Sequence, residues 1–199
     1  PSSIHHKGRE AFDALERART DTAHVIGAHP DEIIFTGSGT EANNLALCGV
    51  VQCVRRRTSH ILTSQIEHDS VLLTAKQLQK DGFDVEYIPV DIQGKIAIAD
   101  VISRIRKETA LVSIMYANNE IGTVEPIREL ANTLRENFGE DRPLLHTDAC
   151  QAPGQLPLDV TMLDADLMTL NGGKMYGPKG VGMLYVRSGI RLTQQIVGG

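Results

Sequence analysis

The chain has 199 residues, of which 41% are hydrophobic and 23% charged, and its formal net charge at pH 7 is −5. This length and apolar content support one sizeable core, so we expect one domain or a large part of one. The net negative charge argues against direct binding to nucleic acid. No apolar run approaches the roughly 20 residues of a membrane-spanning helix, so we expect no membrane association. The three cysteines form no regular disulfide framework, which favours a reducing, cytoplasmic setting.

Short apolar segments alternate with longer amphipathic ones along the chain. A leading helix is expected within residues 1–29, ending near Gly27. Strands are predicted at 32–36, 60–64, 84–90, 110–116, 144–148, 166–171 and 181–187. Helices are predicted at 38–57, 68–80, 98–107 and 126–138, and Arg55, Arg56 and Arg57 are interpreted as a solvated helix end. This order predicts an α/β fold with a mostly parallel, mixed sheet flanked by helices.

Polar or glycine-rich segments follow five of the predicted strands, at the point where each strand ends. They are TGSGTEANN (36–44), EHD (67–69), ANNEIG (117–122), TDACQ (147–151) and NGGK (171–174). Ligands of open parallel sheets bind outside the carboxyl ends of the strands. We therefore expect these five segments to converge on one crevice.

The glycine loop from Gly37 to Ala42 follows a strand and opens a helix. Backbone N–H groups at a helix N-terminus bind a phosphate well. The hexapeptide also fits the dinucleotide fingerprint G-x-G-x-x-A, but that motif needs an acidic residue at the tip of the second strand, where Ser64 and Gln65 stand. A single phosphate is enough to explain the loop, and a nicotinamide-dependent dehydrogenase is kept as an alternative.

Asp148 ends a buried strand, and Lys174 lies between glycine-bearing turns in NGGKMYGPKG (171–180). Alone, a strand-end aspartate often caps a turn, and a lysine in such a loop is often only solvated. Beside a phosphate loop, however, they complete the set that pyridoxal phosphate uses: a lysine for covalent attachment, a carboxylate for the ring nitrogen and a helix end for the phosphate. His68 fits either a helix cap or a contact in the same site.

Taken together, these segments resemble the cysteine desulfurases, which are pyridoxal-phosphate enzymes of fold type I in the class V aminotransferase group. Six stretches in the family's order and spacing carry the resemblance: PSSIH (1–5), IIFTGSGTEANNLA (33–46), EHDSV (67–71), SIMYANNEIGTVEPI (113–127), LLHTDACQAPGQLPLDV (144–160) and NGGKMYGPKGVGMLYVR (171–187). The resemblance implies that residues 1–199 are the cofactor-binding large domain of such an enzyme, with the N-terminal arm and the small C-terminal domain lying outside them.

The resemblance also implies a role for each residue that matches the family's cofactor site. As catalytic residues, Lys174 would bind pyridoxal 5'-phosphate covalently, Asp148 would pair with the ring nitrogen, and His68 would stack on the ring. The other implied cofactor contacts are Gly39 and Thr40 at the phosphate, Asn119 and Gln151 near the phenolic oxygen, and Asn171, Gly172 and Gly173 around the phosphate and the lysine. The glycines would let the backbone pass close to the bound phosphate and ring. No metal ligand is expected.

The implied reaction removes sulfur from L-cysteine, giving alanine and a persulfide on an enzyme thiolate. None of Cys48, Cys53 and Cys150 matches the family's nucleophile. We therefore expect the nucleophile, and the arginine that binds the substrate carboxylate, to lie outside these residues, and the 199-residue chain alone to be inactive. The resemblance further implies a homodimer for the full-length protein and a sulfur-acceptor protein as a partner.

Two positions depart from the family pattern. Gly173 stands where histidine usually precedes the lysine, and Asn171 stands where serine is common. The missing imidazole leaves the handling of protons open, whereas asparagine and serine can both hydrogen-bond a phosphate. Two further alternatives stay open: another class V enzyme, such as a selenocysteine lyase or an aminotransferase, and a non-catalytic module that keeps the fold.

Overall fold

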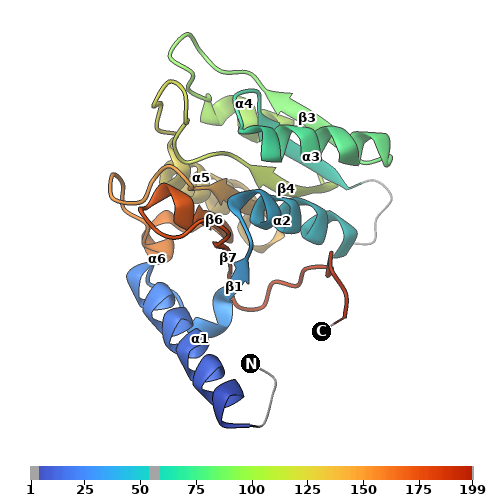
Figure 1. Cartoon of the computed structure of the whole chain (residues 1–199). Coiled ribbons are helices and arrows are strands. Elements are labelled where there is room, and N and C mark those ends of the chain that lie inside the picture. Colours follow the sequence, from blue (N-terminus) through green and yellow to red (C-terminus); the bar gives the residue numbers. More distant parts are fainter. Residues whose placement is uncertain (1–4, 54–58, 199) are drawn as a thin grey trace.

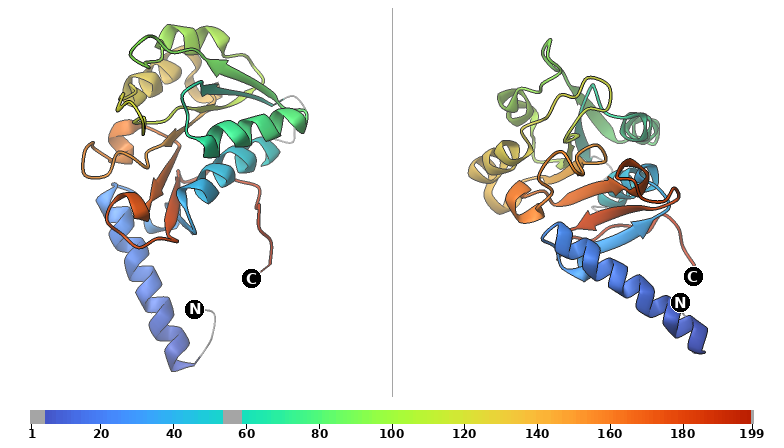
Figure 2. Two further views of the ribbon diagram at one scale, coloured as in Figure 1. Left: turned by 45° about the horizontal axis from the view of Figure 1, so that its top comes forward. Right: turned by 60° about the vertical axis from the view of Figure 1, so that its left-hand side comes forward.

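The computed structural model describes residues 5–53 and 59–198. Arg55, Arg56 and Arg57, which we expected at a helix end, lie outside the described residues. Seven strands form one sheet in the order β1-β7-β6-β5-β4-β2-β3 (Figure 1). Figure 2 shows helices on both sides of this sheet and α1 projecting away from it. The predicted α/β class is confirmed.

The strands are β1 (Ile33–Thr36), β2 (His60–Ser64), β3 (Asp84–Ile88), β4 (Thr109–Ser113), β5 (Leu144–Asp148), β6 (Leu167–Asn171) and β7 (Gly182–Val186). The helices are α1 (His6–Val25), α2 (Gly39–Cys53), α3 (Asp69–Lys80), α4 (Ile98–Arg104), α5 (Ile127–Phe138) and α6 (Val160–Leu163). The sequence did not predict α6, because its four residues are too few to show a helical period. In the part of the chain that the structure describes, no helix is both long and apolar enough to cross a membrane.

Among the described strands, β7 is antiparallel to both of its neighbours, β6 and β1. The pairs among β2, β3, β4, β5 and β6 are parallel. This makes the sheet mixed, as predicted. Because β1 lies antiparallel to β7, it points in the same direction as β6. The carboxyl ends of β1 to β6 therefore meet at one edge, which we call the carboxyl edge, and the opposite edge is the amino edge.

Apolar side chains pack on both faces of the sheet. Ile61 and Leu62 are adjacent in β2 but belong to different clusters, because successive strand side chains point to opposite faces. Leu47 of α2 packs in the cluster that contains Ile61, whereas Leu130 and Leu134 of α5 pack in the cluster that contains Leu62. The two helical layers hold the sheet between them, so its edges are where polar groups gather.

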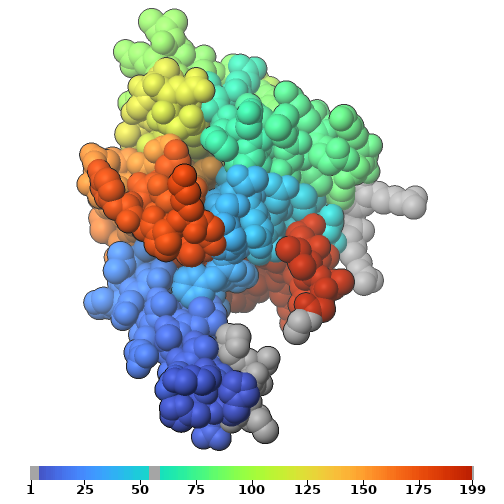
Figure 3. All heavy atoms as spheres, viewed as in Figure 1, coloured from blue at the N-terminus to red at the C-terminus, as the bar shows by residue number. Residues whose placement is uncertain are grey.

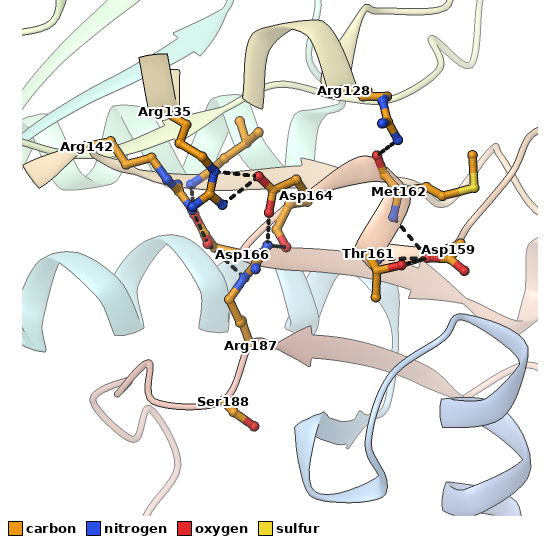
Figure 4. Close-up of polar contacts among 12 residues, drawn as sticks. Arg128, Arg135, Arg142, Asp159, Thr161, Met162, Asp164, Asp166, Arg187 and Ser188 are labelled. Carbon is orange, nitrogen blue, oxygen red and sulfur yellow. Dashed lines mark hydrogen bonds and ion pairs between the residues drawn. The ribbon is translucent and has the colours of Figure 1, made fainter. Parts of the chain in front are cut away.

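An arginine–aspartate cluster occupies the amino edge (Figure 4). Asp166, which is 1% exposed, accepts hydrogen bonds from Arg142 Nη1 at 2.6 Å and Nη2 at 2.8 Å. Hydrogen bonding to Asp166 raises the pKa of Arg142. Arg187 pairs with Asp166 at 3.1 Å and with Asp164 at 2.7 Å. Arg135 of α5 also binds Asp164. Opposite charges thus neutralise each other at this edge.

Candidate functional site

A cavity of about 160 Å³ opens at the carboxyl edge, where β5 and β6 end and α2 and α3 begin. Figure 3 shows the orange loop that follows β6 beside the blue start of α2. Each of the five polar segments contributes to the cavity wall, so the predicted convergence is confirmed. The lining residues are Gly39, Thr40, Asn43, His68, Ser70, Met115, Ala117, Asn119, Asp148, Cys150, Gln151, Asn171 and Lys174.

The glycine loop forms one wall of the cavity and starts α2. Gly39 is buried, and a Cβ there would lie 2.8 Å from Sγ of Cys150. A Cβ on Gly182, the first residue of β7, would overlap the backbone of Ser38. Both glycines are therefore needed for the loop to sit against the ends of β6 and β7. The first N–H groups of a helix have no partner within it, and Gly39 and Thr40 bring this end of α2 to the cavity.

Asp148 is the last residue of β5 and is 6% exposed. Its Oδ2 accepts a hydrogen bond from Asn43 Nδ2 at 2.6 Å, and its Oδ1 accepts one from the backbone N–H of Cys150 at 3.0 Å. Within the described residues, no ion pair gives Asp148 a cationic partner. An unpaired buried carboxylate is costly, so it suits a cationic group on a ligand.

His68 is the N-cap of α3, so its interpretation as a helix cap is confirmed. Its Nδ1 accepts a hydrogen bond from the backbone N–H of Ser70 at 3.1 Å and lies 2.8 Å from Ser70 Oγ. The imidazole is also part of the cavity wall. The cap and the site contact are therefore compatible, because the cap engages one ring nitrogen and leaves the other available.

Lys174 ends the short 3-10 helix Gly172–Lys174 that directly follows β6. Asn171 caps this helix, because its Oδ1 accepts a hydrogen bond from the backbone N–H of Gly173 at 3.2 Å. The Lys174 side chain is exposed and lines the cavity. Lys179, further along the same loop, is also exposed but is not among the lining residues. The two lysines are thus distinguished by their positions relative to the cavity.

Gly172 and Gly173 do not line the cavity, unlike the other predicted site residues. A Cβ on Gly172 would lie 3.1 Å from the carbonyl oxygen of Val181 and 3.3 Å from that of Pro178. Among the described residues, Gly172 thus approaches the loop's own backbone closely. A Cβ on Gly173 would meet only Asn171 Oδ1, at 3.7 Å, so this position has room for a side chain.

The three cysteines are free thiols of intermediate exposure. Burial, together with the nearby Asp148 carboxylate, raises the pKa of the Cys150 thiol well above its usual range. Burial also raises the pKa of Cys48, which packs against the core from α2, the helix that ends at Cys53. Nucleophilic cysteines need a lowered pKa. Cys150 therefore lines the cavity as a thiol whose raised pKa disfavours the thiolate.

Five lining residues were not among the predicted site residues: Asn43, Ser70, Met115, Ala117 and Cys150. Asn43 lies one helical turn after Gly39, a spacing that places two residues on one face of a helix, whereas Ser70 lies two residues after His68, a spacing that does not. Helical spacing from the glycine loop could have found Asn43. Met115 and Ala117 are apolar, and no sequence pattern indicates that they line a site.

Glu67, the residue before His68, is a buried acid below the cavity wall. Its Oε1 accepts hydrogen bonds from Ser64 Oγ at 2.6 Å and from the backbone N–H of Met115 at 2.9 Å, whereas its Oε2 is buried and has no partner in the described part of the chain. Burial raises the pKa of Glu67 to about 8, and the negative charges of Asp148 and Glu125 add to this effect. Burial therefore favours the neutral form of Glu67, which joins the end of β2 to the residues that follow β4.

The whole chain, residues 1–199, matches the family model described as Aminotransferase class-V. It is 48% identical over 199 residues to the cysteine desulfurase IscS of Dictyoglomus turgidum, covering 100% of this chain and 50% of that protein. It is 46% identical over 200 residues to the mitochondrial cysteine desulfurase of Candida albicans, covering 100% of this chain and 40% of that protein.

Solved structures show the same fold. A NifS-like protein matches with a TM-score of 0.95 at 38% identity, covering 100% of this chain and 54% of that chain. The structure described as SspA in complex with cysteine matches with a TM-score of 0.94 at 40% identity, covering 100% and 57%. The chain spans about half the length of the curated relatives that it matches. Because the family model extends over every residue, this chain belongs to the class V aminotransferase family.

Proposed function

We propose that residues 1–199 are the cofactor-binding large domain of a pyridoxal-phosphate-dependent cysteine desulfurase. One observation carries this proposal: a single cavity brings together the exposed amine of Lys174, the buried carboxylate of Asp148 and the N-terminus of α2. These groups match the aldehyde, the ring nitrogen and the phosphate of pyridoxal phosphate, respectively. The similarity to proteins named cysteine desulfurase supports the same activity for the full-length protein.

The cavity residues fit this cofactor. Asp148 accepts one hydrogen bond at each carboxylate oxygen, which leaves further lone pairs for a protonated ring nitrogen. Because no described residue gives Asp148 a cationic partner, its carboxylate can stabilise the positive charge of a protonated ring nitrogen. Gly39, whose side-chain space is taken by Cys150, keeps the start of α2 open to a phosphate.

When bound, pyridoxal phosphate supplies an electron sink for the α-carbon of an amino acid. Asp148 would keep the ring nitrogen protonated by charge pairing, and the backbone N–H groups of Gly39 and Thr40 would hold the phosphate. Lys174 would hold the cofactor, and its Nζ would move the proton at the substrate α-carbon. His68 would stack on the ring, with Asn119, Gln151 and Asn171 as polar contacts. Gly172 and Gly173 would shape the approach to Lys174.

Sulfur removal from L-cysteine needs a thiolate that can reach the substrate sulfur. Cys150 does not meet this need, because burial and Asp148 keep it protonated. We therefore assign the nucleophile, and the arginine for the substrate carboxylate, to the half of the relatives that this chain does not span. A solved relative in complex with cysteine supports L-cysteine as the substrate. A homodimer, a sulfur-acceptor protein and a cytoplasmic setting complete the proposal for the full-length protein.

The cofactor assignment is tested by borohydride reduction of protein mixed with pyridoxal phosphate, followed by peptide mapping. We expect the pyridoxyl group on Lys174 and none on Lys174→Ala protein. Lys179→Ala is the matched control, because Lys179 lies in the same loop outside the cavity wall, and it should label as the wild type does. A label found only on Lys179 would refute the assignment. In the full-length protein, release of alanine and sulfide from L-cysteine should disappear with Lys174→Ala.

A further inference from the structure

A chain of hydrogen bonds joins Asp148 to His68 through two buried residues. Asn43 Nδ2 donates to Asp148 Oδ2 at 2.6 Å and to Ser70 Oγ at 2.8 Å. Ser70 Oγ in turn lies 2.8 Å from His68 Nδ1. Asn43 is 1% exposed and Ser70 is 7% exposed. The chain thus crosses from the end of β5 through α2 to the start of α3, and it connects two residues of the proposed cofactor site.

The direction of each bond follows from the atoms available. An ionised carboxylate can only accept, so the Asn43 atom that faces Asp148 must be Nδ2. Nδ2 carries two hydrogens, and the second is directed at Ser70 Oγ. Because Ser70 Oγ accepts this hydrogen bond, its own hydrogen is left to donate to His68 Nδ1. The charge of Asp148 therefore sets the direction of the whole chain.

The orientation of the Asn43 amide supports this direction. With Nδ2 turned to Asp148, Oδ1 of Asn43 is buried and has no partner among the described residues. An unpaired buried acceptor costs free energy. The short, charge-assisted hydrogen bond to Asp148 offsets that cost, because bonds to ionised groups are roughly twice as strong as neutral ones.

His68 Nδ1 receives two donors in this arrangement: the Ser70 hydroxyl and the Ser70 backbone N–H, at 3.1 Å. A ring nitrogen that accepts hydrogen bonds does not carry the proton, so the neutral imidazole has its hydrogen on Nε2. The hydrogen bonds found among the described residues engage only Nδ1 of this ring. The Nε2–H group is left for the cavity that His68 lines.

We propose that Asn43 and Ser70 are positioning residues that hold His68 in its Nε2–H tautomer, so that the ring offers a hydrogen-bond donor to the cavity. The chemical meaning of this role rests on the proposed function. A donor at this place would stabilise negative charge on a bound substrate. It would not act as a base, so that removal of a proton would fall to Lys174.

The tautomer can be measured directly by ¹⁵N NMR of the histidine rings in the chain without cofactor. The His68 signals are identified by their loss in His68→Gln. In wild-type protein we expect a protonated Nε2 and an unprotonated Nδ1. A wild-type ring with its proton on Nδ1 would overturn the proposal without any need for a variant in the hydrogen-bond chain.

Variants test whether Asn43 and Ser70 set the tautomer. In Asn43→Ala, Ser70 Oγ is free to accept from Nδ1–H, and in Ser70→Ala, Nδ1 loses its hydroxyl donor. Each change should raise the Nδ1–H population relative to Nε2–H by roughly 2- to 10-fold, the equilibrium equivalent of one net hydrogen bond. Ser70→Thr keeps the hydroxyl and should restore the wild-type ratio. An unchanged ratio in either alanine variant would refute the role of that residue.

Thr147→Val is the matched control, because Thr147 precedes Asp148 in β5 and its buried hydroxyl has no partner among the described residues. This variant should leave the His68 tautomer as it is in the wild type. The two proposals fail separately. Absence of the pyridoxyl label on Lys174 refutes the cofactor assignment and leaves the tautomer measurement valid, whereas a wrong tautomer refutes only the roles of Asn43 and Ser70.

Discussion

The two edges of the sheet differ in whether their buried aspartate is paired with a cation. At the amino edge, Asp166 receives two hydrogen bonds from Arg142 and pairs with Arg187. At the carboxyl edge, Asp148 is nearly as buried, but among the described residues it binds only the amide of Asn43 and a backbone N–H. The charge of Asp166 is thus neutralised by arginines inside the fold, whereas the charge of Asp148 stays available to a ligand. The amino edge of the sheet therefore stabilises the fold, and the carboxyl edge presents the charged group of the candidate site.

The largest effect is expected for Asp166→Asn. It leaves Arg142 and Arg187 partly buried without their shared carboxylate, so we expect a loss of about 3–5 kcal/mol in the free energy of unfolding, measured with urea. The matched change Asp148→Asn removes a charge that has no cationic partner, and it should cost less than about 1 kcal/mol. Equal losses in the two variants would remove the contrast between the edges.

Glu67→Gln should show the next largest effect, and only at high pH. Burial raises the pKa of Glu67 from 4.5 to about 8, so the folded protein keeps a proton that the unfolded chain releases. Its contribution to stability is therefore fully present below pH 4.5 and is lost as the pH rises through about 8.

Glutamine keeps the Oε1 acceptor and cannot ionise. Above about pH 8, Glu67→Gln should therefore be more stable than the wild type by on the order of 3 kcal/mol. Urea unfolding at a series of pH values from acid to alkaline measures this difference. Parallel stability curves for the two proteins would show that Glu67 is already ionised in the folded state at neutral pH.

The smallest effect is expected for Arg135→Ala at the exposed rim of the amino-edge cluster. The Arg135 side chain is 49% exposed and pairs with Asp164 at 2.6 Å, and Asp164 keeps its second partner, Arg187. Exposed ion pairs contribute about 0.2–1 kcal/mol and weaken with salt. The shift in thermal midpoint should be small and should shrink further at high ionic strength. A loss as large as that of Asp166→Asn would contradict the importance that we assign to burial.

The sequence predicted the alternation of strands and helices because each element carries its own local period. It did not predict where β7 lies. An apolar run such as Gly182–Val186 indicates a buried strand, but it carries no information on the direction of the strand or on its neighbours. The insertion of β7 between β6 and β1 depends on contacts with both strands, and periodicity does not report such contacts.

The site was predictable to the extent that its residues follow strand ends. Asp148, Asn171 and Lys174 are near the ends of their strands, so the topology of the sheet brings them to one edge. The hydrogen bonds of Asn43 were not predictable because its partners are distant in sequence: Ser70 lies 27 residues away and Asp148 lies 105 residues away. The close neighbours of Gly172 were not predictable for a related reason, because they are carbonyl groups of a loop whose path the sequence does not give.

The pairing of β1 with β7 has a consequence for the order of folding. Most of the chain separates these two strands, and β7 is the only sheet neighbour of β1 in the described residues. Contacts between distant parts of a chain form slowly, because a long loop must close before they give any stabilisation. The glycine loop that leaves β1 is held against Gly182, so it can reach its final place only after β7 has docked. We therefore expect the anion-binding end of α2 to mature late, and a nascent chain that ends before β7 to be unable to capture a phosphate.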